Sequence, residues 1–268
     1  MVPSKALGTL LLMASLSSAS PVLADLTPNP APAGSSAQGT SLAAPLPPPS
    51  ADPLLPVPRD RDYEWMKLSE WNRQHEENVA VANLGEADLV FVGDSITAAL
   101  RHSEAFKLAF ADCKVANLGI GGDKTQNVLW RLEHGETGKL HPKLVSVLIG
   151  TNNIGLTEDD LNNTVKGVKA VVNKLHKAFP HSKILIVGIF PRGESASDPV
   201  RAKVSGINQK LSKLADDKTF FFRDIGNVFL EKDGTLPSSI SVDHLHLTEA
   251  GMQRWADAIS PTIHQLMK

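Results

Sequence analysis

The chain has very little cysteine and no excess of either charge. Cys113 is the one cysteine among 268 residues, which excludes an internal disulfide framework and a metal site built from several cysteines. The 27 Lys and Arg residues are nearly balanced by 29 Asp and Glu residues, giving a formal net charge of −2. This balance provides no basic field for nucleic acid and no polybasic membrane anchor.

Long hydrophobic runs are also missing at the N-terminus. The apolar segment 6–16 follows Lys5 and precedes small residues that end at Ala24. It is too short to span a membrane as a stable helix, and the pattern is typical of a secretory signal peptide over residues 1–24. No cysteine follows the predicted cleavage site, which argues against a lipoprotein anchor. We therefore expect an exported protein, periplasmic or extracellular.

The next segment, residues 25–58, is dominated by Pro, Ala and Ser. Such a composition cannot bury enough apolar surface to offset chain entropy, so a disordered linker is predicted. The folded domain is expected over 59–268, with an N-terminal helix at 63–84 and a core at 87–268.

Within the core, short apolar runs alternate with segments of helical periodicity. The predicted strands are 88–92, 114–118, 143–150, 183–190 and 219–225. The predicted helices are 97–110, 123–133, one beginning near Thr157, 198–215, and one capped by Thr248 that runs to the C-terminus. Strands that alternate with helices predict an α/β fold with a five-stranded parallel sheet.

Polar or glycine-rich loops follow these strands. They are Gly93-Asp94-Ser95, Gly119 to Gly122, Gly150-Thr151-Asn152 and, after a longer loop, Asp243-x-x-His246. Because connections between parallel strands return each strand end to the same edge of the sheet, the first three loops are expected to converge there.

These loops contain the parts that acyl transfer requires. Ser95 is the candidate nucleophile and His246 the candidate general base. Asp243, one helical turn before His246, can fix the tautomer of the ring and stabilise the imidazolium. The backbone N–H groups of Ser95 and Gly122 and the side-chain amide of Asn152 are candidate donors to the oxyanion.

Other interpretations of the same residues remain open. The glycine loop could bind phosphate, but it lacks the spacing and the Lys-Ser/Thr end of a P-loop. Asp243, His244 and His246 could bind a metal, since alternate residues of an extended segment share a face. A chain that kept the fold as a non-catalytic binding module is a third alternative, although such a module has no need of a serine, a histidine and an aspartate together.

The motifs resemble those of the SGNH (GDSL) hydrolases. The similar segments are LVFVGDSIT, NLGIGGDKTQNVLWRLEHGE, GTNN, GIFPRGE and DHLHLT, and the likeness is closest to the esterases related to the platelet-activating-factor acetylhydrolase Ib catalytic subunits. The resemblance covers about residues 87–268. It implies a three-layer α/β/α flavodoxin-like fold and esterase chemistry without a cofactor. By matching motif it also implies Ser95, Asp243 and His246 as the triad and Gly122 and Asn152 as oxyanion donors.

The sequence thus predicts an exported serine esterase acting on short-chain, acetyl-type esters. A carbohydrate acetylesterase and a lysophospholipase of the same fold are the alternatives, so the substrate is a small ester, either a lipid or an acetylated sugar. Ile96, Thr151 and Leu245 adjoin catalytic positions in the sequence and are the candidate acyl-pocket residues. We expect no metal, no cofactor and no nucleic-acid partner, and the oligomeric state stays open.

Overall fold

The computed structural model describes residues 52–157 and 159–268. The predicted signal peptide and residues 25–51 of the predicted linker lie outside the described residues. Residues 52–58, which the sequence places at the end of the linker, are in contact with the domain. The backbone of Val57 exchanges hydrogen bonds with Gln126 and Asn127, at 3.1 and 3.0 Å, so the folded region begins before residue 59.

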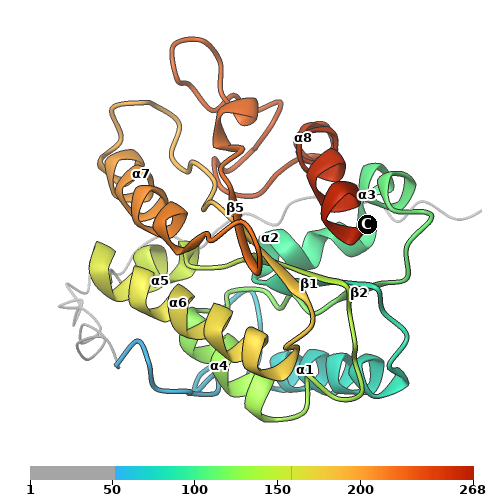
Figure 1. The fold of residues 1–268 in the computed structure, drawn as a ribbon. Coiled ribbons are helices and arrows are strands. Elements are labelled where there is room, and N and C mark those ends of the chain that lie inside the picture. The colour runs from blue at the N-terminus through green and yellow to red at the C-terminus, as the bar shows by residue number, and fades with distance from the viewer. Residues whose placement is uncertain (1–51, 158) are drawn as a thin grey trace, which may run out of the picture. The chain divides into compact units, whose positions relative to one another are not determined.

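Five parallel strands form the central sheet (Figure 1). They are β1 (Leu89–Gly93), β2 (Val115–Asn117), β3 (Leu144–Leu148), β4 (Lys183–Val187) and β5 (Phe220–Arg223). The order across the sheet is β2-β1-β3-β4-β5, with every neighbouring pair parallel. The predicted fold class is confirmed. The order changes direction beside β1, and in such sheets ligands bind at the carboxyl ends of the strands near that point.

Helices precede the sheet and connect its strands. The α-helices are α1 (Leu68–Leu84), α2 (Ser95–Ala98), α3 (Glu104–Ala109), α4 (Thr125–Glu133), α5 (Thr151–Leu156), α6 (Leu161–Ala178), α7 (Pro199–Leu211) and α8 (Glu249–Met267). Short 3-10 turns are η1 (Ala99–His102), η2 (Ser212–Leu214) and η3 (Gly226–Phe229). Among the described residues, no helix has the length and apolar content that a bilayer crossing requires.

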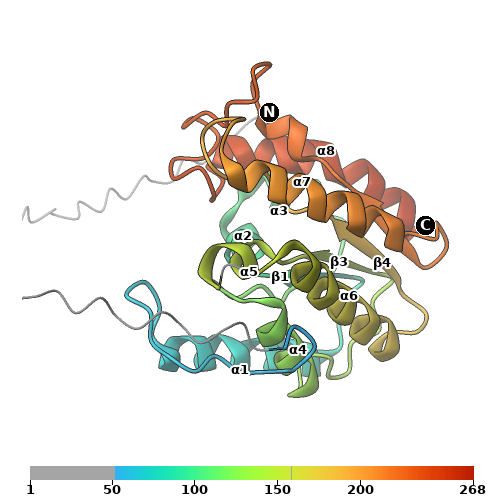
Figure 2. The same cartoon turned by 90° about the vertical axis from the view of Figure 1, so that its left-hand side faces the viewer.

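The strand side chains alternate between two cores, as expected for a sheet buried on both faces. Val90 and Val92 of β1 pack with α1, α4, α6 and α7, whereas Leu89 and Phe91 pack with α2, α3 and α8. Figure 2 shows α1 and α4 side by side on one side of the strands, where Trp71 and Trp130 are in ring contact. Helices thus cover both faces and leave the strand ends open to loops.

The helix predicted over 97–110 is wrong as a single element. The chain forms α2, η1 and α3 instead, with a break at Ser103. There the Ser103 hydroxyl donates to Glu249 at 3.0 Å and accepts from the N–H of Phe106 at 3.4 Å, which starts a new helix. A serine hydroxyl that bonds the backbone in this way competes with helix continuation.

Three other helices begin at residues different from those predicted. The first helix begins at Leu68 and not at Tyr63, because Tyr63 and Met66 form an isolated antiparallel bridge around a turn. The helix expected from Asp123 starts at Thr125, since the Asp123 carboxylate bonds tertiary partners. The helix expected near Thr157 is capped by Asp160, whose side chain accepts from the N–H of Asn163 at 2.7 Å.

Candidate active site

Ser95 lies in the tight turn that follows β1. A side chain on Gly93 would clash with Thr97 and with a backbone carbonyl of β3, so only glycine fits there. Asp94 caps α2, because its Oδ1 accepts a hydrogen bond from the N–H of Ile96 at 3.0 Å. The turn therefore presents Ser95 as the first residue of α2, at the carboxyl edge of the sheet.

The structure brings Ser95, His246 and Asp243 into one hydrogen-bonded chain. Ser95 Oγ lies 2.9 Å from His246 Nε2, and His246 Nδ1 lies 2.6 Å from Asp243 Oδ2. Because the carboxylate accepts a hydrogen bond from Nδ1–H, the proton of a neutral ring stays on Nδ1. Nε2 then presents its lone pair to the serine hydroxyl. The side chains of His246 and Asp243 are 49% and 54% exposed, so a substrate can reach them from solvent.

Asp243 is suited to hold this orientation. Partial burial raises its pKa, but hydrogen bonds from the His246 ring and from the backbone N–H groups of His246 and Leu245 outweigh that effect, and the pKa lies at about 2. These N–H groups donate to Oδ1 at 2.7 and 3.1 Å. The carboxylate is therefore ionised at neutral and mildly acidic pH.

Of the other candidate oxyanion donors, Gly122 lies in the loop after β2 and Asn152 in the first turn of α5, after β3. Gly122 has a φ of 72°, and a side chain there would overlap the Trp65 ring, so the position requires glycine. Asn152 is buried, and its Nδ2 donates to the carbonyl oxygen of Asp123 at 3.0 Å. An amide nitrogen carries two protons, so the second one is left for an oxyanion.

Buried charged side chains support the glycine loop, residues 119–122. Asp123 accepts hydrogen bonds from Trp71 Nε1 and Arg131 Nε, both at 2.7 Å, and lies 3.5 Å from Arg59. Burial raises the pKa of Asp123 above its ordinary value. Arg131 also pairs with Glu136 and donates to carbonyl groups at the ends of β1 and β2. The network therefore ties the loop to the strand ends that position Ser95.

A segment before α1 completes this side of the site. Arg59 donates to the carbonyl oxygen of Gly121 at 2.5 Å. The backbones of Tyr63 and Met66 pair with each other, at 2.9 and 3.3 Å, and Trp65 lies between them with 54% of its surface exposed. A Cβ atom built on Gly121 would lie 3.9 Å from both Ser95 Cβ and the Trp65 ring. The exposed indole and Ser95 thus both lie next to Gly121.

The sequence analysis did not identify Arg59 or Trp65 as site residues, because Trp65 fell within the predicted helix 63–84. One signal could have pointed to them. The chain's single tyrosine, Tyr63, is close to Trp65 and Arg59 in a chain with only 5% aromatic residues. In the structure the two rings stack at 4.9 Å, and the Arg59 guanidinium lies 5.3 and 5.4 Å from their centroids.

Asp94 is a second residue that the sequence left as part of a turn. It is 1% exposed, and its Oδ2 has no hydrogen-bond partner among the described residues. Burial raises the pKa of Asp94 to about 7, with a smaller contribution from the nearby charge of Asp123. The hydrogen bond from the N–H of Ile96 and the charge of Arg192 lower it in part. A carboxyl group next to the nucleophile is thus protonated for much of the time at neutral pH.

A cavity of about 510 Å³ opens beside Asp243. Its lining surface is about equally polar and apolar: the charged or polar side chains are Arg192, Glu194, Asp198, Asp243 and His244, the apolar ones are Ile154, Val200 and Leu245, and Gly155 and Gly193 complete it. Arg192 is fixed in this wall, since its Nη1 donates to the carbonyl oxygen of Thr151 at 3.1 Å. Charged side chains interrupt the apolar part of the lining, so it offers no continuous apolar surface to a long acyl chain.

The three candidate acyl-pocket residues occupy different environments. Ile96 is 2% exposed and packs in the core on the α8 side of the sheet. Thr151 is 3% exposed, at the start of α5. Leu245 is half-buried, packs against the same core as Ile96 and lines the cavity. Leu245 alone combines contact with the cavity and a position next to the triad.

His244 and His246, which the sequence suggested as alternative metal ligands, do not point toward a common site. His246 contacts Ser95 and Asp243 through its two ring nitrogens. His244 Nδ1 lies 3.0 Å from the carbonyl oxygen of Leu236, and its Nε2 faces Glu194 at 4.0 Å. In the part of the chain that the structure describes, a group of possible metal ligands lies elsewhere: ligand atoms of Asp112, Cys113 and His264 are within 4.8 Å of one another.

Comparison with known proteins adds sequence and fold relationships. The model of the GDSL-like lipase/acylhydrolase family matches residues 91–254. The human platelet-activating factor acetylhydrolase IB subunit alpha1 is 35% identical over 191 residues, covering 71% of this chain and 78% of that protein. A GDSL-like lipase from Bacteroides thetaiotaomicron has a similar fold, with a TM-score of 0.58, 21% identity and coverage of 74% and 98% of the two chains. An acetyl xylan esterase, AlAXEase, aligns with a TM-score of 0.56 at 24% identity, over 65% of this chain and 98% of that one.

Proposed function

Because the chain belongs to the GDSL-like lipase/acylhydrolase family, we propose that it is a serine esterase that hydrolyses short-chain, acetyl-type carboxylic esters. The observation that carries the proposal is the hydrogen-bonded chain from Ser95 through His246 to Asp243. Each member of the chain has the partner that nucleophilic catalysis requires.

In the proposed mechanism, Ser95 Oγ attacks the ester carbonyl while His246 Nε2 accepts the hydroxyl proton. The charge that develops on the carbonyl oxygen is stabilised by the N–H groups of Ser95 and Gly122 and by the amide of Asn152. His246 then returns the proton to the leaving alcohol. Water repeats the sequence, with His246 again as the base, and releases the acid and free Ser95.

Hydrolysis of p-nitrophenyl acetate by Ser95→Ala tests the proposed nucleophile. We expect turnover to fall by at least about 10³, because no other group replaces the attacking oxygen. Ser212→Ala, at an exposed serine that ends α7, is the matched control and should match the wild type. Retained activity in Ser95→Ala would refute the serine mechanism.

The environment of Trp65 favours a carbohydrate as the alcohol part of the ester. An exposed indole near Ser95 can stack on the apolar face of a pyranose, and a choline cation would use the same kind of aromatic face. Arg59 already lies within cation–π distance of both Tyr63 and Trp65, and its positive charge opposes a second cation there. The fold shared with an acetyl xylan esterase agrees with this proposal but does not carry it.

A substrate comparison separates the carbohydrate from the lipid alternative. Trp65→Ala should lower kcat/KM on an acetylated methyl xyloside by roughly tenfold, which corresponds to about 1.4 kcal/mol. The same variant should hydrolyse ethyl acetate like the wild type, because ethanol is too small to stack, and Trp65→Phe should retain part of the preference. Faster wild-type hydrolysis of an acetylated choline phospholipid than of the xyloside would favour the lipid alternative.

Export is also part of the proposal, and it rests on the sequence of residues 1–24 alone. If these residues are a signal peptide, the protein recovered outside the cytoplasm should begin at Asp25. N-terminal sequencing of that protein tests the proposal, and a mature chain that still carries residues 1–24 would contradict it.

A further inference from the structure

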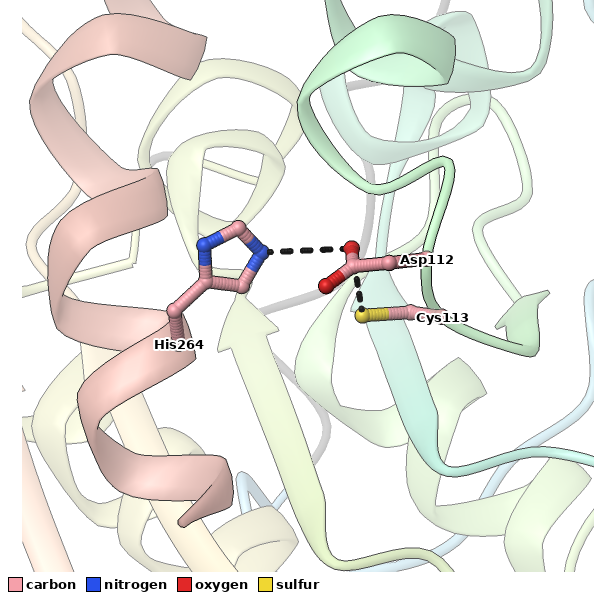
Figure 3. A group of neighbouring side chains, drawn as sticks. All are labelled: Asp112, Cys113 and His264. Atoms are coloured by element: carbon pink, nitrogen blue, oxygen red, sulfur yellow. Dashed lines mark hydrogen bonds and ion pairs between the residues drawn. The ribbon is translucent and has the colours of Figure 1, made fainter.

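Asp112, Cys113 and His264 form a group of ligand-type side chains far from the active site. Asp112 and Cys113 precede β2, so they lie at the amino edge of the parallel sheet, whereas Ser95 follows β1 at the carboxyl edge. His264 comes from the last turns of α8. Figure 3 shows its ring facing the carboxylate of Asp112, with the Cys113 sulfur beside that carboxylate. The catalytic chemistry uses none of these residues.

The separations of the three ligand atoms match those of a zinc site. Cys113 Sγ lies 3.4 Å from Asp112 Oδ1, and His264 Nε2 lies 3.6 Å from the same oxygen. One ligand atom from each residue lies within 4.8 Å of the other two. In a tetrahedral site with metal–ligand bonds of about 2.0–2.3 Å, neighbouring ligand atoms are roughly 3.3–3.6 Å apart. The two separations from Asp112 Oδ1 already fall in that range, and a small movement of the Cys113 or His264 side chain would bring Sγ and Nε2 into it as well.

Two of the ligands are held in place by contacts with Phe110. The N–H of Cys113 donates to the carbonyl oxygen of Phe110 at 3.0 Å. The His264 ring packs edge-on against the Phe110 ring, with centroids 5.6 Å apart. Phe110 is 4% exposed, so it is a fixed point of the core. His264 Nε2 is buried and makes no hydrogen bond with any described residue, although it faces the carboxylate.

We propose that Asp112, Cys113 and His264 bind a zinc ion. The ligands would be one Asp112 carboxylate oxygen, Cys113 Sγ and His264 Nε2, and water would occupy the fourth position. A thiolate and an imidazole select zinc over calcium and magnesium, which prefer oxygen ligands. Binding forms the sulfur–zinc bond and releases the thiol proton to solvent.

The surroundings leave room for the ion and its water. A cavity of about 490 Å³ adjoins the three ligands, and its other lining residues are Asp88, Lys143, Met267 and Lys268. One thiolate and two carboxylates outnumber the two lysines, so the net local charge is negative and favours binding of a positive ion. The ion would join the turn before β2 to the end of α8, two segments that are distant in the sequence. Its effect should therefore be on stability, with no effect on ester hydrolysis.

Cobalt binding tests the site on tag-free, full-length protein. Co²⁺ added to the wild type should give a near-ultraviolet thiolate-to-cobalt charge-transfer band that saturates at one ion per chain, and excess Zn²⁺ should abolish it. Cys113→Ser should lose the band, and His264→Gln should weaken binding at least tenfold. The control His181→Gln, at an exposed histidine outside the group, should bind like the wild type.

A second measurement needs no variant and covers the case in which a substitution impairs folding. Zn²⁺ should slow the alkylation of Cys113 by iodoacetamide and raise the Tm of the wild type, and a chelator should reverse both effects. If the wild type shows neither the cobalt band nor protection of Cys113, then Asp112 only pairs with the thiol and with His264, and the proposal is wrong. Binding that persists unchanged in Cys113→Ser would also overturn it.

Discussion

At the scale of single residues, the candidate site combines an exposed chain of hydrogen-bonded side chains with a buried support. Ser95, His246 and Asp243 could be predicted from the sequence, because each belongs to a short motif whose neighbours fix the local backbone. Arg59 could not be predicted in this way. It bonds Gly121, 62 positions away, and only tertiary structure brings the two together. The raised pKa of Asp94 likewise depends on burial that no local pattern reports.

Asn152 offers a prediction at this scale. Asn152→Ala removes one of three donors aimed at charge that appears only in the transition state, so turnover should fall by roughly 10²–10³ with little change in KM. Steady-state kinetics with p-nitrophenyl acetate measures both parameters. Asn162→Ala, at an exposed asparagine of α6, is the control. An unchanged turnover number would exclude Asn152 from the mechanism.

The pKa of Asp94 gives a pH-dependent prediction. In the folded protein it is about 7, against an ordinary value of 3.8, so the folded state holds the proton more tightly. The contribution of Asp94 to the free energy of unfolding therefore falls as pH rises from about 4 to about 7 and is constant above that range. Asp94→Asn keeps an acceptor for the N–H of Ile96 but cannot ionise.

The gain in stability of Asp94→Asn over the wild type should thus be larger at pH 8 than at pH 5, by an amount on the order of a few kcal/mol. Urea unfolding of both proteins at the two pH values measures it. Groups other than Asp94 titrate in both proteins and cancel in the difference. Equal differences at pH 5 and pH 8 would contradict the raised pKa.

At the scale of elements, the apolar runs predicted all five strands. The reason is clearest for β1, β3 and β4, which are buried on both faces and therefore apolar along almost their whole length. Helix starts were less predictable. The Asp123 side chain resembles a helix cap in the sequence, but its carboxylate is used by Trp71 and Arg131. Thr157 and Asp160 both fit a cap, and the choice between them depends on α5, a short helix that the sequence did not indicate.

The segment before α1 provides the prediction at this scale. Arg59→Ala removes the hydrogen bond to Gly121 and one of the three partners of the buried Asp123, which should reduce the free energy of unfolding by roughly 1–3 kcal/mol. Turnover should fall as well, because the loop that carries Gly122 loses its support. Arg61→Ala is the matched control, since Arg61 is half exposed and pairs only with its neighbour Asp60. Equal Tm and turnover in the two variants would show that the segment does not support the site.

At the scale of the whole molecule, the distribution of charge around the triad sets the expected acyl length. The cavity beside Asp243 contains Arg192, Glu194 and Asp198, and Leu245 is one of its few apolar walls. Each additional methylene could add about 0.8 kcal/mol of binding only where an apolar surface receives it. We therefore expect kcat/KM to be highest for acetyl and propionyl esters.

A p-nitrophenyl ester series from acetate to laurate measures this preference, and Leu245→Ala should shift the optimum to longer chains by removing the wall. If the wild type prefers octanoate or longer esters, the small-pocket hypothesis is wrong and a lipase-like role is favoured. An optimum that stays the same in Leu245→Ala would place the acyl group away from Leu245.

The central claim is that Ser95 is the nucleophile of an acyl-enzyme mechanism. Reaction with a fluorophosphonate, followed by mass spectrometry of the digested protein, tests it most directly because the adduct marks the attacking oxygen. We predict one adduct per chain, on the peptide that contains Ser95, with labelling abolished in Ser95→Ala and strongly slowed in His246→Ala. An adduct on another residue, or hydrolysis that continues after Ser95 is fully labelled, would contradict the claim.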